Sequence, residues 1–234
     1  MKIIVGISFF CMSQFLVGQT IIPVSTYENT TSIENFSTGG GMWITTRPPS
    51  SAIKGTPYLF NSWYNFTKIY IDNKSYALNS VNYNLDKDRF EARFSNDSVL
   101  VINLHNVKKI EIRKKILKPF FDPDIQSVTF FEEIFNSEIL LLKRHSVKIR
   151  EGNINPMTLE KIRPDEYIKK FNYYLKKDEN SSLEKVSLKK STILKLFDQD
   201  YKSEIKEYAK EENLRFKNET DLIKILRYYN KLKK

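Results

Sequence analysis

Between residues 67 and 149, hydrophobic and polar positions alternate in short runs, the pattern of strands with one buried face. Polar segments such as 72–74 and 86–88 separate these runs and carry residues that favour turns. The expected strands are 67–71, 75–78, 81–85, 89–94, 99–104, 107–112, 128–135 and 139–149. This spacing predicts an antiparallel β-meander, folded as a curved sheet or a partly open barrel.

Residues 165–177 fit two patterns. Pro164 suits the first position of a helix, whereas the aromatic and β-favouring residues 171–175 suit a strand. We expect a strand here, paired with residues 182–186. Residues 151–166, with one glycine and two prolines, are expected to form a loop.

From residue 187 the hydrophobic period becomes helical. Ser187 is the expected cap of a first helix, and Asn218 with Asp221 three residues later resembles the capping box of a third. The apolar positions at helical spacing are Leu188, Ile193, Leu194, Phe197, Tyr201, Ile205, Tyr208, Ala209, Leu222, Ile225, Leu226 and Tyr229. Three short amphipathic helices follow from this pattern, and each is too short to be stable alone.

These elements predict an α+β fold, in which a C-terminal bundle of three short helices follows the β-meander. We expect four segments along the chain. They are a signal peptide at 1–19, a flexible leader at 20–54, an antiparallel β-rich domain at 55–186, and a helical segment at 187–234 that packs on the sheet or on itself.

Residues 1–19 have the pattern of an export signal. Lys2 is followed by the apolar residues 3–12 and by Gly18, a small residue near a cleavage point. The apolar run is shorter than the roughly 20 residues of a spanning helix. A retained anchor, a core strand and, because of Cys11, a lipoprotein are the alternatives. We expect export to the periplasm, the outer membrane or the medium, with no transmembrane helix left after processing.

Basic residues are concentrated in the second part of the chain. Residues 20–104 contain seven Lys or Arg and seven Asp or Glu, whereas residues 105–234 contain 30 and 21. The formal net charge of +10 favours anionic partners. An exported protein meets little nucleic acid, so anionic envelope lipid or glycan is the partner class that we expect. The alternative is that the charge serves solubility alone.

Two surfaces are candidates for a ligand or a partner. The first is an aromatic cluster that begins at residue 58, which could stack on sugar rings or form core. The second is a row of lysines at i, i+4 and i+8 on the middle helix, which could face an anion or only solvent. The candidate residues are Tyr58, Phe60, Trp63, Tyr64, Lys202, Lys206 and Lys210.

The sequence shows no pattern specific to catalysis. His105 and His145 are the only histidines and lie far apart, so we expect no metal site, and we expect no cofactor. Asp122 and Asp124 flank a proline and are expected to form a turn rather than a catalytic pair. A hydrolase whose site is scattered along the sequence stays open as an alternative.

Several segments together carry a resemblance to a known family. They are residues 54–60 (KGTPYLF), Trp63, residues 81–84 (VNYN), Phe90-Glu91, residues 141–145 and residues 226–230. In these segments the chain resembles a family of exported Bacteroidota proteins that have no assigned activity. The resemblance covers most of the chain after the signal and implies an exported protein, without implying any catalytic residue.

The sequence therefore favours an exported, non-enzymatic envelope or secreted protein with a binding or structural role. A periplasmic carrier or sensor of anionic lipid or glycan is the first alternative. A hydrolase is the second.

Overall fold

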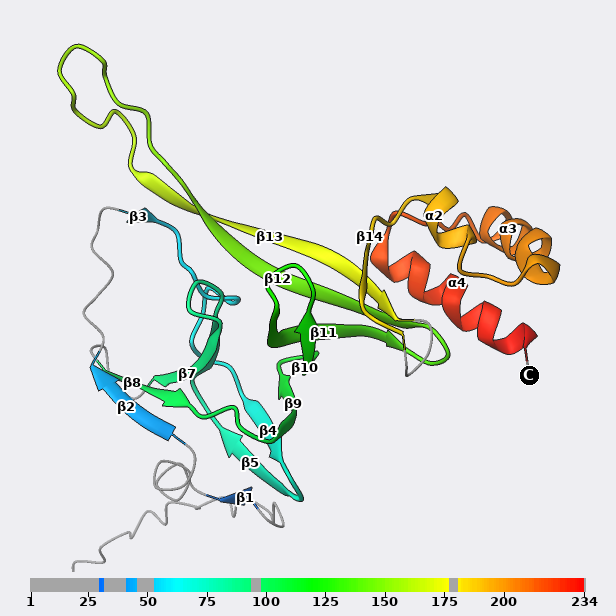
Figure 1. The fold of residues 1–234 in the computed structure, drawn as a ribbon, viewed down its shortest axis with the longest axis horizontal. Coiled ribbons are helices and arrows are strands. Elements are labelled where there is room, and N and C mark those ends of the chain that lie inside the picture. Colours follow the sequence, from blue (N-terminus) through cyan, green and yellow to red (C-terminus); the bar gives the residue numbers. More distant parts are fainter. Residues whose placement is uncertain (1–29, 32–40, 46–52, 94–97, 177–180, 234) are drawn as a thin grey trace, which may run out of the picture.

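The computed structural model describes residues 30–31, 41–45, 53–93, 98–176 and 181–233, and Figure 1 shows their arrangement. The expected signal at 1–19, with Cys11, lies outside the described residues. Within the described ranges, none of the helices has the length and apolar character needed to cross a membrane.

The larger of two sheets, sheet A, contains ten strands in the order β1-β5-β4-β9-β10-β11-β12-β13-β14, with β3 beside β13. The strands are β1 (Thr30–Thr31), β3 (Ile53–Lys54), β4 (Thr67–Ile71), β5 (Lys74–Leu78), β9 (Val107–Ile112), β10 (Lys115–Asp122), β11 (Ser127–Asn136), β12 (Leu140–Arg150), β13 (Asp165–Lys176) and β14 (Glu184–Val186). β1 with β5 and β3 with β13 are parallel pairs, and the other pairs are antiparallel. Sheet A is therefore open and mixed.

The smaller sheet, sheet B, is antiparallel and has the order β2-β8-β7-β6. Its strands are β2 (Gly41–Thr45), β6 (Val81–Asn84), β7 (Arg89–Arg93) and β8 (Ser98–Ile102). Every residue of β6 is buried, as are the three central residues of β7. Sheet B thus lies in the interior on both faces where these two strands run.

The structure confirms the α+β class and corrects the topology within it. One meander or a partly open barrel was the expectation, but the strands divide between two open sheets. β10 was not among the expected strands, and its last residues were interpreted as part of a turn around Pro123. Pro119 is tolerated because the pairing of β10 with β9 ends at Leu117, so its missing N–H faces no partner strand there.

Most expected strands lie within one or two residues of the observed ones, and 107–112 has the same bounds. Of the range 165–177, Asp165–Lys176 form the strand β13, as the aromatic pattern indicated, with β14 as a partner. The leader expected at 20–54 includes the short strands β1, β2 and β3, and the rest of that range lies outside the described residues.

The C-terminal helices are α2 (Lys190–Leu194), the 3-10 turn η1 (Gln199–Tyr201), α3 (Lys202–Glu211) and α4 (Glu219–Leu232). The Asn218 side chain caps α4 by accepting a hydrogen bond from Asp221 N at 3.0 Å, as expected. Ser187 does not cap α2. That helix starts after Lys189 and has no side-chain cap, because the chain leaves β14 in an extended path.

Two large hydrophobic cores lie in different parts of the molecule. The first, around Ile69, Phe90 and Ile110, is formed by strands of sheets A and B. The second joins the three helices to one end of sheet A through Leu141 and Leu175. The helices therefore fold against the end of the β12–β13 hairpin, as Figure 1 shows.

The buried side chain of Asn82 on β6 holds the segment before β4 in place. Its Nδ2 donates to Phe60 O at 2.8 Å and to Ser62 O at 3.3 Å, and its Oδ1 accepts from Phe60 N at 3.1 Å. Tyr58 from the same segment donates its hydroxyl hydrogen to buried Glu91 at 2.7 Å. Residues 54–60, 81–84 and 90–91, which carry part of the family resemblance, thus contact one another.

We predict that Asn82→Ala lowers the free energy of unfolding by about 2–4 kcal/mol, because it leaves several buried backbone groups without partners. Urea denaturation followed by circular dichroism measures this change. Asn73→Ala, at an exposed turn where the side chain makes one contact of 3.5 Å, is the matched control and should change stability by less than about 0.5 kcal/mol. Equal effects of the two substitutions would contradict the assignment.

Candidate functional site

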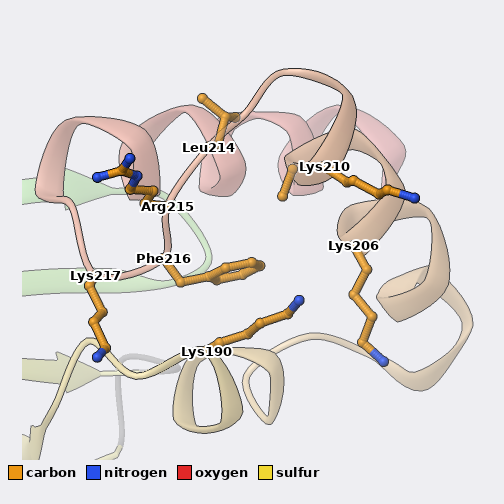
Figure 2. Close-up of a pocket in the computed structure, with 8 residues that line it drawn as sticks. Lys190, Lys206, Lys210, Leu214, Arg215, Phe216 and Lys217 are labelled. Carbon is orange, nitrogen blue, oxygen red and sulfur yellow. The ribbon is translucent and has the colours of Figure 1, made fainter.

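A basic pocket of about 440 Å³ lies among the three C-terminal helices (Figure 2). Lys190 comes from α2, Lys206 and Lys210 come from α3, and the remaining cations come from the connection between α3 and α4. The lining residues are Lys190, Lys206, Ala209, Lys210, Leu214, Arg215, Phe216 and Lys217. Among the residues that the structure describes, none of those lining this pocket is acidic.

Apolar packing sets the shape of the pocket. Phe216 and Ala209 belong to the second hydrophobic core, and the ammonium group of Lys190 lies 5.7 Å from the centre of the Phe216 ring. The turn before Phe216 is held by Arg215 N, which donates to the Asp221 carboxylate at 3.1 Å. The pocket thus has a packed aromatic wall, beside which the Lys190 ammonium group lies.

The five cations differ in where their charged ends lie. Figure 2 shows Lys190 and Lys206 beside the hollow in front of Phe216, whereas Lys210, Arg215 and Lys217 lie around its rim. Within the described ranges, none of the five forms an ion pair with a carboxylate. Like charges that line one pocket repel one another, and an anion in the hollow would relieve that repulsion.

The three lysines expected to line one side of the middle helix separate in the structure. Lys206 and Lys210 line the pocket, but Lys202 stands at the first position of α3 and donates to Gln199 Oε1 at 3.0 Å. Lys190, Arg215 and Lys217 were missed by the sequence reasoning, because they belong to other elements. The dense basic composition after residue 104 was the only signal for them.

The aromatic candidates do not form one continuous surface. Tyr58 and Trp63 meet edge to face with centroids 4.6 Å apart, and the Arg93 guanidinium lies 5.0 Å from the Trp63 ring. Phe60 packs on the first core and under Arg113. The Tyr64 side chain, in contrast, is 91% exposed to solvent. Three of the four aromatics thus help to hold the segment on the sheets.

A cluster of opposite charges occupies the face of sheet A near the helices. Glu132 Oε2 lies 2.6 Å from His145 Nε2, and Lys115 donates to the other carboxylate oxygen. Burial alone would raise the pKa of Glu132, but the hydrogen bonds from His145 and Lys115 outweigh it and lower that pKa. Next to this cluster, Glu219 of α4 accepts from Lys143 at 2.8 Å and so joins the helix to the sheet.

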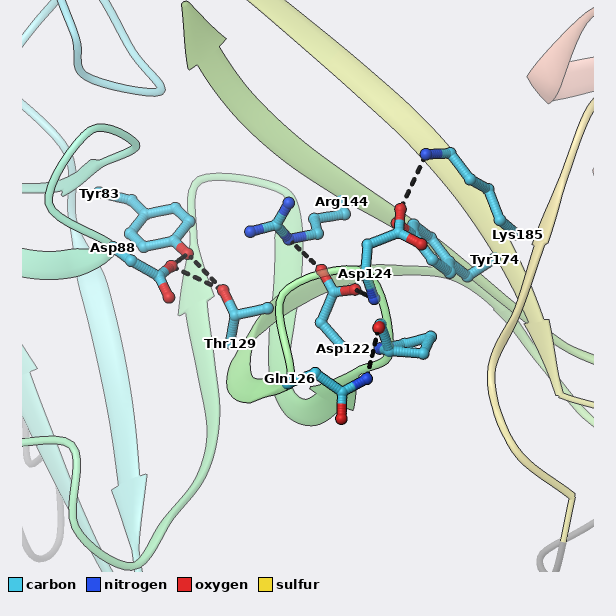
Figure 3. A network of polar contacts seen from close by, with 10 residues as sticks. Tyr83, Asp88, Asp122, Asp124, Gln126, Thr129, Arg144, Tyr174 and Lys185 are labelled. Carbon is cyan, nitrogen blue, oxygen red and sulfur yellow. Dashed lines mark hydrogen bonds and ion pairs between the residues drawn. The ribbon is translucent and has the colours of Figure 1, made fainter.

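Asp122 and Asp124 do not converge on a common cleft (Figure 3). Asp122 is fully buried at the end of β10, and its Oδ2 lies 2.6 Å from Arg144 Nε as an ion pair that is not aligned as a hydrogen bond. Asp124 lies in the turn after β10 and accepts from Lys185 and Tyr174, each at 2.8 Å. The expected turn is therefore present, but it begins one residue after Asp122.

The lowered pKa values of Asp124 and Glu132 oppose a role of either carboxyl group as a general acid. Hydrogen bonds from Lys185 and Tyr174 lower the pKa of Asp124, and the pKa of Glu132 is lowered too. A general acid at neutral pH requires a carboxyl group whose pKa is raised. These two groups are better described as partners in ion pairs.

The two histidines have different settings. His145 lies on β12 as expected, beside Glu132. His105 lies between the expected strands 99–104 and 107–112, in the exposed turn before β9, where its backbone N–H donates to Asn103 Oδ1 at 3.0 Å. Within the ranges that the structure describes, no three His, Cys, Asp or Glu side chains gather as a metal site would require.

Comparison of the chain with protein-family models, curated proteins and solved structures finds no significant match. The candidate site therefore depends on its own geometry and charge.

We predict that Glu132→Gln flattens the dependence of stability on pH. The pKa of Glu132 is lowered on folding, so its stabilising contribution is complete above the ordinary carboxyl value of 4.5 and is lost as the pH falls through the lowered pKa. Urea unfolding of both proteins between about pH 6 and pH 3 measures this difference. The wild type should lose more stability than the variant over that interval. Parallel curves would show that the cluster does not stabilise the charged carboxylate.

Proposed function

We propose that this protein is an exported, non-enzymatic binding protein whose basic pocket takes a compact anionic group. The observation that carries the proposal is the set of five cations around one hollow, none of which is ion-paired within the described ranges. Elsewhere in the described chain many Lys and Arg side chains do have carboxylate partners, such as Lys115, Lys118 and Lys143. The pocket thus concentrates positive charge that the fold itself does not neutralise.

The size and the walls of the pocket favour a head group rather than an acyl chain. The space between the helices and the end of sheet A is filled by the second hydrophobic core, so a lipid tail would have to displace packed side chains. Phosphate and carboxylate groups match lysine and arginine donors through charge-assisted hydrogen bonds. Phosphate or carboxylate groups of envelope lipid or glycan are therefore the ligands that we propose.

The location belongs to the same proposal. The charge and apolar order of residues 1–19 and the resemblance to exported Bacteroidota proteins both support export. Removal of residues 1–19 would remove Cys11, the only cysteine, and leave a chain without disulfides that relies on its hydrophobic cores.

We predict that Lys190→Gln combined with Lys206→Gln weakens binding of inorganic pyrophosphate by about 5- to 30-fold, because each partly exposed cation contributes about 0.5–1 kcal/mol. Isothermal titration calorimetry at low salt measures the affinity. Lys202→Gln is the matched control, since Lys202 belongs to the same helix as Lys206 but does not line the pocket. An equal loss in the control would show a diffuse charge effect and contradict the pocket assignment.

We also predict that the native cells contain the protein outside the cytoplasm and without its first 18 or 19 residues. Cell fractionation followed by intact-mass measurement tests both points. A full-length chain with Met1 in the cytoplasmic fraction would contradict export. It would not contradict anion binding at the basic pocket, which the calorimetry tests separately.

A further inference from the structure

The hairpin of β12 and β13 extends well beyond the rest of sheet A (Figure 1). Its antiparallel pairing runs without a break from Leu140 and Lys176 to Arg150 and Glu166. The neighbouring strand β11 pairs with β12 only as far as Lys143, so the outer part is mainly a two-stranded ribbon. The short strand β3 adds a parallel pairing with β13 at Asp165 and Glu166.

The end of this ribbon, residues 153–162, is an ordered tip. Asn155 N donates to Glu160 O at 2.9 Å, Leu159 N donates to Asn155 O at 2.8 Å, and Ile162 N donates to Asn153 O at 2.8 Å. Below the tip, a Cβ atom at Gly152 would lie 1.8 Å from Arg163 O, so only glycine allows the two strands to approach this closely. The backbone of the tip is therefore closed and well bonded.

This tip exposes large apolar side chains to solvent. The exposed fractions are 53% for Ile154, 91% for Met157, 79% for Leu159 and 65% for Ile162. Leu159 also has φ = +58°, in the left-handed region that disfavours a leucine. Apolar exposure and local backbone strain together are features that folded proteins retain at sites of interaction.

Charged residues surround the tip on the ribbon. Residues 148–170 contain six Lys or Arg and four Asp or Glu. Arg150 pairs with Glu166 and Lys161 pairs with Asp165. Of the other charged residues, four basic ones (Lys148, Arg163, Lys169 and Lys170) and two acidic ones (Glu151 and Glu160) form no ion pair within the described ranges, which leaves a net charge of +2. Next to the apolar end there is thus an excess of positive charge.

We propose that the tip is a wedge that inserts into the interfacial region of a membrane containing anionic lipid. A convex apolar end with basic residues behind it suits a bilayer, where side chains enter to a depth of about 5–10 Å and cations meet lipid phosphates. A protein partner would have to supply a matching hollow, whereas a bilayer accepts the wedge at any rotation about the ribbon. The proposal is independent of the basic pocket, which lies at the opposite end of the ribbon.

Flotation with vesicles tests the wedge on the processed full chain. One set of vesicles contains phosphatidylethanolamine and phosphatidylglycerol, and a second set contains phosphatidylcholine alone. We expect the wild type to float with the anionic set. Met157→Ser combined with Leu159→Asn should lower this partitioning about tenfold or more, because it removes two exposed apolar side chains while asparagine tolerates a positive φ.

Tyr64→Ser is the matched control. Tyr64 is 91% exposed, as Met157 is, but it lies on the body of the protein, and its replacement should change partitioning by less than about twofold. In addition, Met157→Trp should give a blue-shifted emission that brominated lipid quenches, as expected for a side chain inside the interface.

Three results would overturn the wedge. They are a wild type that floats with neither set of vesicles, a tip variant that floats like the wild type, and a loss of flotation confined to the Lys190→Gln/Lys206→Gln variant. The last result would move the membrane contact to the helical end and would leave the anionic pocket in place. If the Lys190→Gln/Lys206→Gln variant loses pyrophosphate binding but floats like the wild type, the membrane contact is not at the helical end. The two proposals can therefore fail separately.

Discussion

The register of the β12–β13 hairpin is the constraint on which both ends of the molecule depend. Leu141 lies opposite Leu175, and this pair belongs to the core shared with the helices. The next pair, Leu142 and Tyr174, turns to the other face and belongs to a separate cluster around Phe131. A slip of one residue would exchange these faces, so that the helices would lose their apolar platform. Because the same ladder continues to Arg150, this register also fixes where the strands reach the tip.

Much of the local structure could be predicted, because period and turn chemistry are local properties. The bounds 107–112 and the Asn218 cap are examples. The pairing of strands was not accessible in this way. The sequences of β6 and β7 alternate like those of strands with one wet face, yet their polar residues Asn82, Asn84 and Glu91 are buried as well, so the pattern does not mark the division into two sheets. β4 pairs with β9 although strands β6, β7 and β8 of sheet B lie between them in sequence, and a pattern of short strands cannot reveal that contact. β10 was missed because its last residues, 120–122, were taken as part of a turn around Pro123, and the sequence does not show that Pro119 lies where β9 no longer pairs with β10.

The candidate site was predictable to a smaller extent. Helical spacing places Lys206 and Lys210 on one side of a helix, and both do line the pocket. Lys202 is at the first position of α3 and donates to Gln199 of the preceding 3-10 turn, a partner that the helical spacing does not indicate. Lys190 and Lys206 line the same pocket because their helices pack around Phe216. The spacing of residues along the sequence does not reveal such a long-range contact. The apolar tip could have been noticed from Met157 and Leu159, but a proline-containing loop gives no measure of exposure.

The distribution of stability along the chain gives the two ends different properties. The three C-terminal helices are too short to be stable on their own, so their order depends on the core that they share with Leu141 and Leu175. The tip has no such core, and an isolated two-stranded ribbon is marginal in water. Its order depends on the continuous ladder below it, on the close approach at Gly152 and on the addition of β3. A ribbon of about 11 paired residues spans about 35 Å, so a contact made by the tip would hold the helical end well away from it. The electrostatic influence of the pocket on such a contact would then be weak, because that separation exceeds the Debye length of about 8 Å at physiological salt.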